Sequence, residues 1–396
     1  MTALVDEAAA LVNKAISPPD YRALVIIGGY GRGEGGVEIV DGDDRPHNNL
    51  DFLLIAETLR PKKLQALRES LMRALLPVMQ QYEIEIDISV VSIWKLRMSP
   101  SLIIWYDMRF GHKTILGDAN YVSALSRFRV DQIPTRDAIR LLVNRGTLLL
   151  INDQLLDQGN ESIESRRRII RNNMKAVIGY GDALLFFLGQ YHWSYVERQS
   201  RMRSCDDVPK AFRSLYDEAA EFRLQPNYAH YQSRDLRACS TDLRNALEPI
   251  HRMCEIRRLG AAELQWDKYL DLVLRHAFSD EPLSARAWVR KGLHLTRRTN
   301  CSQELSARAR LGCKVMGTKD RSQLVFPLLA YHLKEPKLQA FAAATLNVPP
   351  ESSIETLREA YIRLWCEEID INSLSDLRAW HVPVAQKNDK QCSSSS

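Results

Sequence analysis

The hydrophobic pattern divides the chain into an N-terminal part with strands and helices and a longer helical part. An apolar run at 23–27, rich in β-branched and aliphatic residues, predicts a buried strand. A second predicted strand, 49–56, carries one carboxylate, Asp51, in an otherwise apolar segment. A third, 83–92, alternates apolar and polar residues, which places Asp87 on its polar face.

Amphipathic helices flank these strands. The pattern predicts helices over 2–16 and 61–81, and a last short strand over 113–118. This alternation is typical of an α/β (α+β) domain with helices against a small mixed sheet. From residue 134 to about 369 the periodicity is helical almost without interruption.

Six of the nine residues at 28–36 are glycines, in Gly28-Gly29-Tyr30-Gly31-Arg32-Gly33-Glu34-Gly35-Gly36, and a segment so rich in glycine predicts a turn that ends the first strand. Glycine lets the backbone approach a phosphate closely. A Rossmann fold needs a long helix directly after this turn, but a polar insert at 37–48 and another strand follow. A Gly-Lys-Ser/Thr phosphate loop is absent from the sequence.

The acidic residues of the second and third strands indicate a metal site. Carboxylates that face one way from adjacent strands can hold Mg²⁺, which prefers hard oxygen ligands. Asp51 and Asp87 have the required placement if their strands are neighbours. The sequence therefore predicts that both side chains converge beside the Gly28-Gly29 bend.

This combination resembles the polymerase-β-like nucleotidyltransferase superfamily, in particular a small bacterial nucleotidyltransferase domain followed by a helical domain. Members place a Gly-Gly or Gly-Ser pair after the first strand, Asp-x-Asp on the second and another Asp on a later strand. Gly28-Gly29, Asp51 and Asp87 match these motifs over the first third of the chain. Asn49 occupies the position of the first Asp, which removes one negative charge.

The resemblance implies an Mg²⁺-dependent transfer of a nucleoside monophosphate from an NTP to a hydroxyl acceptor. Asp51 and Asp87 would be the catalytic residues and, with Asn49, the metal ligands, while Glu34 or Glu85 could supply the missing charge. A basic residue of the helical domain would reach the triphosphate, and Lys175 is the candidate; its alternative is an ion pair with Asp182. The nucleotide-binding set is then Gly28, Gly29, Tyr30, Gly31, Arg32 and Lys175.

The same resemblance suggests the domain organisation. We expect a catalytic domain at 1–130, a helical domain lining the cleft at 131–300, a further helical region at 301–383 and a disordered tail at 384–396.

Charge and cysteine content add the cellular context. The net charge is +5, and the positive charges of the second half are interspersed, so a nucleic-acid partner is the weaker expectation. Seven cysteines without Cys-x-x-Cys spacing indicate reduced thiols, as in cytoplasmic proteins. The apolar runs are far shorter than a membrane span, so we expect no membrane partner.

Several functions stay open at this point. The leading one is transfer to a small molecule such as a sugar or antibiotic. Alternatives are nucleotidyl transfer to protein or RNA, and a catalytically degenerate nucleotide-binding or regulatory protein, which Asn49 would explain. RNA cleavage by the helical half is weaker still: Arg244 and His251 fit the loose Arg-x(4–6)-His pattern of HEPN ribonucleases, but Pro249 lies between them.

Overall fold

The computed structural model describes residues 2–40, 42–159, 162–277, 285–295 and 305–368. The chain divides into two compact units. The first consists of residues 1–138 and 181–233, and the second of residues 139–180 and 234–396. Helices α6 (Thr135–Asp157) and α7 (Ile163–Phe187) contribute residues to both.

A four-stranded mixed sheet forms the centre of the first unit, in the order β5-β4-β1-β6. Its strands are β1 (Tyr21–Ile27), β4 (Leu50–Ala56), β5 (Ile86–Ser92) and β6 (Lys113–Gly117). β1 is antiparallel to both β4 and β6, whereas β4 and β5 are parallel. The expected α/β region with a mixed sheet, followed by helices, is confirmed at this level.

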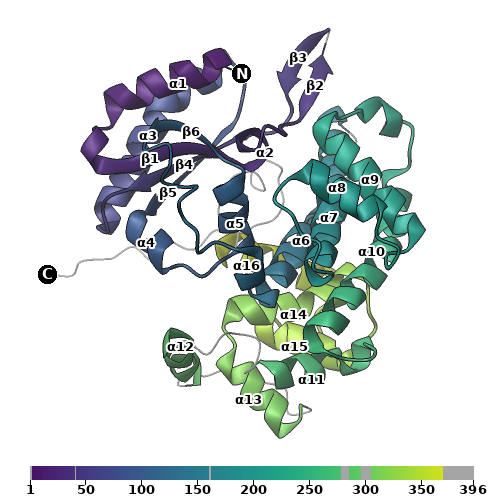
Figure 1. Ribbon diagram of the computed structural model, residues 1–396. Helices are drawn as coiled ribbons and strands as arrows, with labels where there is room; N and C mark the ends of the chain where they lie inside the picture. The colour runs from purple at the N-terminus through teal and green to yellow at the C-terminus, as the bar shows by residue number, and fades with distance from the viewer. Residues whose placement is uncertain (1, 41, 160–161, 278–284, 296–304, 369–396) are drawn as a thin grey trace, which may run out of the picture. The chain divides into compact units, whose positions relative to one another are not determined.

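Helices cover both faces of this sheet (Figure 1). Helices α1 (Thr2–Ala15) and α3 (Pro61–Gln81) pack on the face that carries Leu24, Phe52 and Ile86. Helices α4 (Ile93–Met98) and α5 (Ile103–Phe110) cover the other face, which carries Val25, Leu53 and Val91. Successive strand residues point to opposite faces, so burial on both sides explains the continuous apolar run of β1.

The glycine segment forms one helical turn, α2 (Gly28–Gly31), rather than an irregular turn. The insert after it is a hairpin of β2 (Val37–Val40) and β3 (Asp43–Pro46), which projects from the sheet in Figure 1. Gly42, with φ +89°, lies between the two strands in the left-handed region that glycine tolerates.

The rest of the first unit is helical. Short 3₁₀ turns at Pro18–Asp20, Val130–Gln132 and Tyr228–Tyr231 accompany α8 (Tyr195–Arg203) and α9 (Lys210–Leu224). The helical periodicity continues as far as His192, but α7 ends at Phe187. Gly189 then adopts φ +71°, and Ser194 caps α8 by accepting a hydrogen bond from the backbone N–H of Glu197.

The second unit is built from helices around a buried apolar core. Besides parts of α6 and α7, they are α10 (Leu236–Leu259), α11 (Trp266–His276), α12 (Ala285–Leu295), α13 (Ala307–Val315), α14 (Thr318–Ala330), α15 (Pro336–Leu346) and α16 (Ile354–Glu368). Among the described residues, no helix combines the length and apolarity needed to cross a membrane.

The boundaries of the two units differ from the domain boundaries expected from the sequence. Residues 181–233 belong to the first unit, although the sequence grouped them with the helical domain at 131–300. The second unit joins 234–300 to the region expected at 301–383. The tail at 384–396 lies outside the described residues.

Candidate functional site

Asp51 and Asp87 lie side by side in the first unit. The parallel register of β4 and β5 pairs Asp51 with Asp87, as it pairs Leu50 with Ile86 before them. Paired residues of neighbouring strands share a face of the sheet, so the two carboxylates project in the same direction. Both side chains are half-buried.

The glycine bend lies directly against Asp51. Ile27, the last residue of β1, pairs with Asp51, and Gly28 follows with φ +70°. A Cβ atom at Gly28 would overlap the Asp51 carboxylate. Glycine is therefore required here both by the backbone conformation and by the acid beside it.

Asn49 joins this pair. It lies two residues before Asp51, and its side-chain N–H donates a hydrogen bond to Asp87 Oδ2. Within the residues that the structure describes, no group of three or more His, Cys, Asp and Glu side chains is arranged to hold a metal. The candidate ligand set is therefore two carboxylates and one carboxamide: Asp51, Asp87 and Asn49.

The Arg32 side chain points into the protein, so it does not face solvent as a phosphate ligand would. Its Nη2 donates to Asp107 Oδ2 over 2.6 Å, and its side chain is only 6% exposed. Burial disfavours the guanidinium charge, but Asp107, Tyr195 and Tyr191 together outweigh burial and raise the pKa of Arg32. Arg32 Nε and Nη1 are buried and have no hydrogen-bond partner among the described residues.

Three guanidinium groups surround the ring of Tyr195, the first residue of α8. The Cζ atoms of Arg223, Arg198 and Arg32 lie 3.9, 4.0 and 4.7 Å from the ring centroid. Burial alone would raise the pKa of Tyr195, but the positive charges of these three arginines lower it to about 8. A tyrosine with this pKa is unusual, and such groups concentrate at functional sites.

Arg223 also reaches the glycine bend. From near the end of α9 its Nη2 lies 3.2 Å from the position that a Cβ of Gly29 would occupy. No motif or spacing in the sequence links Arg223 to a glycine almost two hundred residues earlier. Lys175, the residue expected from the sequence to reach the triphosphate, belongs to the second unit, and its role stays a prediction.

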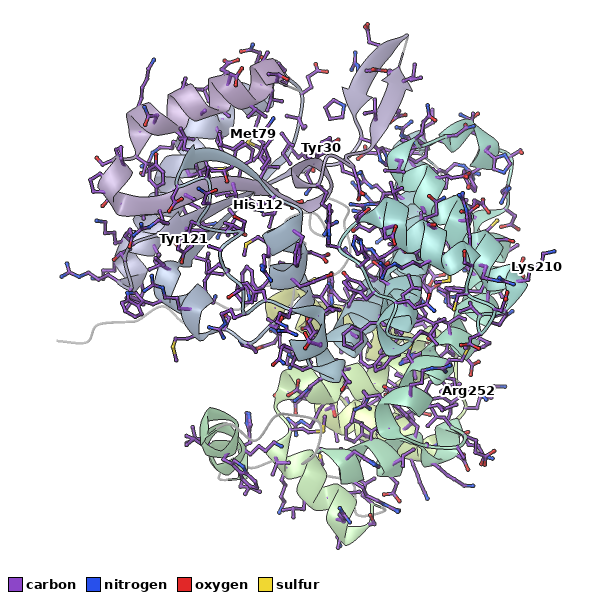
Figure 2. The ribbon with its side chains drawn as sticks, viewed as in Figure 1. Tyr30, Met79, His112, Tyr121, Lys210 and Arg252 are labelled. Atoms are coloured by element: carbon purple, nitrogen blue, oxygen red, sulfur yellow. The ribbon has the colours of Figure 1, made fainter. Side chains whose placement is uncertain are left out.

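The remaining residues of the glycine segment have structural contacts. Glu34 accepts hydrogen bonds from Ser194 Oγ and from the backbone N–H of Tyr195, so it caps α8 instead of joining Asp51. Tyr30 lies at the turn between β1 and the hairpin (Figure 2), where its hydroxyl donates to the Gly36 carbonyl over 2.8 Å. Glu85 is exposed.

A buried ionic network fixes the helices that carry Tyr195 and Arg223. Asp182 accepts hydrogen bonds from Arg198 Nη1 and from the Tyr216 hydroxyl, the latter over 2.7 Å. The Tyr191 hydroxyl donates to Asp107 over 3.0 Å. These hydrogen bonds connect α5, α7, α8 and α9 around the glycine segment. The network therefore orders the side of the site opposite the sheet.

The ribonuclease alternative lacks an accessible histidine. His251 is fully buried, and its Nδ1 lies 2.9 Å from the Tyr331 hydroxyl. An imidazole in this position does not reach an RNA phosphate. Pro249 lies inside α10, so the helix continues through it.

No family model and no curated protein matches this chain. The resemblance to nucleotidyltransferases therefore stays a prediction from the residues that carry it in the sequence, Gly28-Gly29, Asp51 and Asp87.

Proposed function

We propose that the first unit is an Mg²⁺-dependent nucleotidyltransferase that moves a nucleoside monophosphate from an NTP to a hydroxyl acceptor. The observation that carries the proposal is the pairing of Asp51 with Asp87 on adjacent strands, directly against Gly28. Carboxylates paired beside a backbone that only glycine can form suit a metal-bound triphosphate. A small acceptor such as a sugar or antibiotic is the leading choice.

The residues present fit the metal. Asp51 and Asp87 offer hard anionic oxygens on one face, and the Asn49 carboxamide oxygen is a neutral ligand. Bound Mg²⁺ would offset the negative charge that develops on the attacking and leaving oxygens. Asp87 would in addition accept the proton of the acceptor hydroxyl.

Arg223 takes the phosphate-binding role that the sequence assigned to Arg32 and Lys175. Its guanidinium lies at the Gly29 backbone, where it can donate to phosphate oxygens that approach the bend. Arg32 instead holds α5 to the glycine segment through Asp107. Arg32 is thus a positioning residue in this proposal.

The test is transfer of α-labelled nucleotide to a panel of acceptors, with each of the four NTPs and Mg²⁺. The panel contains sugars, aminoglycosides, tRNA and an unrelated protein, which separates the small-molecule from the macromolecular versions. Asp51→Asn and Asp87→Asn should each lower transfer by about a hundredfold or more, because charge stabilisation worth several kcal/mol depends on them.

Asp44→Asn is the matched control, since it neutralises an exposed carboxylate on the neighbouring hairpin. Transfer that survives both site substitutions, or that falls equally in the control, contradicts the proposal.

A second candidate function is nucleotide binding without catalysis. The hydrogen bond from Asn49 to Asp87 favours this function, because the amide N–H stabilises the negative charge of Asp87 as a bound cation would. Calorimetric titration of NTP with and without Mg²⁺ separates the two. Metal-independent binding in the wild type, with transfer appearing only in Asn49→Asp, would establish the degenerate function.

A further inference from the structure

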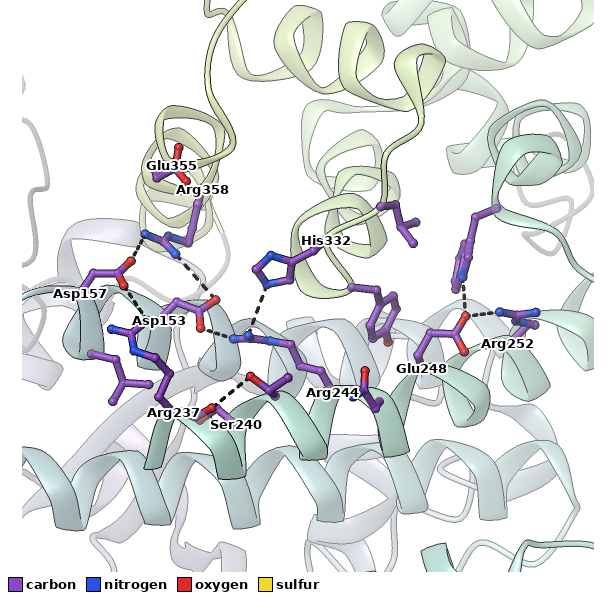
Figure 3. Close-up of a pocket in the computed structure, with 16 residues that line it drawn as sticks. Asp153, Asp157, Arg237, Ser240, Arg244, Glu248, Arg252, His332, Glu355 and Arg358 are labelled. Carbon is purple, nitrogen blue, oxygen red and sulfur yellow. Dashed lines mark hydrogen bonds and ion pairs between the residues drawn. The ribbon is translucent and has the colours of Figure 1, made fainter. Parts of the chain in front are cut away.

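The second unit contains a pocket of about 780 Å³ that the proposed nucleotidyl transfer does not use. Helix α10 forms its floor, and α6, α16 and the segment between α14 and α15 contribute walls (Figure 3). A pocket of this size accommodates a small organic molecule.

The ionic groups at one end form a cluster of three arginines and two aspartates: Arg237, Arg244, Arg358, Asp153 and Asp157. Asp157 accepts from Arg237 over 3.0 Å and from Arg358 over 2.6 Å. Asp153 accepts from Arg244 and lies 3.8 Å from Arg358. Glu355 of α16 lies beside Arg358 at this end (Figure 3), so three guanidinium groups face three carboxylates and the charges balance.

Hydrogen-bond donors without a partner among the described residues lie at the same end of the pocket. Ser240 is 1% exposed, and its hydroxyl has no hydrogen-bond partner in the described part of the chain. Arg244, one helical turn later on α10, is about nine-tenths buried, and its Nε is likewise without a partner, as is Nε of Arg358. Buried polar groups are normally satisfied, so each of these donors indicates a missing acceptor.

His332 adds backbone strain at this end. It adopts φ +50°, a conformation that costs energy in a residue other than glycine and that concentrates at ligand sites. Figure 3 shows its ring beside Arg244, with Nε2 3.3 Å from Nη1. Since arginine only donates, Nε2 accepts and the imidazole is neutral; burial and the charge of Arg244 both lower the pKa of His332.

The other end of the pocket is neutral and partly aromatic. Glu248 accepts from Arg252 and from the Trp266 indole, and Asn245 lies between this pair and the arginine cluster. Ser240 and Glu248 are separated by about 12 Å along the helix. A ligand that reaches both ends is therefore larger than a free phosphate ion and carries polar groups on its body.

We propose that this pocket binds a small phosphomonoester, a sugar phosphate or nucleoside monophosphate, with its phosphate at Ser240, Arg244 and Arg358. The phosphate supplies the acceptors that these donors lack. The hydroxyl-bearing body extends toward Asn245 and Glu248, which offer it an amide and a carboxylate.

The experiment is calorimetric titration of the full chain, with chelator present, using ribose 5-phosphate, adenosine 5′-monophosphate, adenosine and inorganic phosphate. Ser240→Ala removes a hydroxyl without a hydrogen-bond partner among the described residues, so none of their hydrogen bonds is lost. Arg237→Gln removes one exposed guanidinium of the cluster. Ser240→Ala should weaken binding about tenfold, as expected for the loss of a hydrogen bond to a charged group, and Arg237→Gln should weaken it by less, because Arg237 acts on the phosphate only through its charge.

Matched controls are available in the same unit. Ser165→Ala removes another buried hydroxyl without a partner, and Arg275→Gln removes another exposed arginine paired with an aspartate, both outside the pocket. Binding of either phosphomonoester, weakened in the two pocket variants and unchanged in the two controls, supports the proposal.

Three results overturn it. The first is that neither phosphomonoester binds at millimolar concentration. The second is that adenosine binds as well as its monophosphate. The third is binding that Asp51→Ala abolishes and Ser240→Ala leaves intact, because this would place the ligand in the first unit. The proposal does not depend on nucleotidyl transfer, so failure to detect transfer alone does not contradict it.

Discussion

Replacing Gly28 by alanine tests the contact between the glycine bend and Asp51. Two effects combine at this position. The residue has φ +70°, where an L-amino acid costs about 1–2 kcal/mol relative to glycine. The new Cβ would also overlap the Asp51 carboxylate, which must leave its rotamer at a further cost of about 1 kcal/mol.

Gly33 provides the control that separates these effects. It has φ +75°, but nothing lies within 4 Å of a Cβ built on it. Gly33→Ala should therefore show only the backbone cost, and the unfolded-state entropy change is common to both variants. We expect Gly28→Ala to lower the free energy of unfolding by about 1 kcal/mol more than Gly33→Ala, measured by urea denaturation.

The functional consequence is larger than the stability difference. Displacing the Asp51 carboxylate disturbs a metal ligand, so Mg²⁺-dependent NTP binding should be lost in Gly28→Ala and retained in Gly33→Ala. Equal losses of stability in the two variants would refute the inferred contact. Wild-type Mg²⁺-dependent binding by Gly28→Ala would refute the placement of the metal beside the bend.

Two further predictions concern the arginines around Tyr195. The tyrosinate absorbance of the folded protein should show a step near pH 8 that Tyr195→Phe removes. Because the folded pKa lies below the unfolded value of about 10, folding stability relative to Tyr195→Phe should rise between pH 8 and 10 and lose this gain as the pH falls through 8. Arg223→Gln should weaken NTP binding about tenfold, whereas Arg203→Gln, which removes an exposed arginine on α8, should not; equal affinities would exclude Arg223 from the phosphate site.

Hydrophobic periodicity was sufficient to predict the four strands of the sheet and the helices on one of its faces, α1 and α3, but not α4 and α5 on the other face. The apolar run of β1 and the leucine stripe of α3 fixed these elements within one or two residues, because burial alone determines both patterns. Pro61 marked the start of α3, where its missing N–H costs nothing. The pairing of Asp51 with Asp87 followed once their strands were neighbours.

The other half of the candidate site depends on contacts that periodicity does not encode. Tyr195 and Arg223 meet the glycine bend through tertiary packing of α8 and α9. One local signal was present: Ser194 and Glu197 have Ser-x-x-Glu spacing, which predicts a helix start at that point, and the structure has Ser194 as the N-cap of α8. The direction of the Arg32 side chain had no such signal, since only its partner Asp107 determines it.

The substitution of Asn49 for the expected aspartate has an electrostatic consequence for the metal-free protein. Carboxylates on neighbouring strands lie about 5 Å apart and repel by about 3 kcal/mol at an effective dielectric constant near 20. A third carboxylate at position 49 would increase this repulsion, whereas the Asn49 amide donates to Asp87 and offsets part of it. Asn49→Asp should therefore lower the unfolding free energy in chelator and restore it with Mg²⁺. Thermal denaturation with and without the metal measures both effects, and a variant whose stability is independent of Mg²⁺ would show that position 49 does not belong to a cation site.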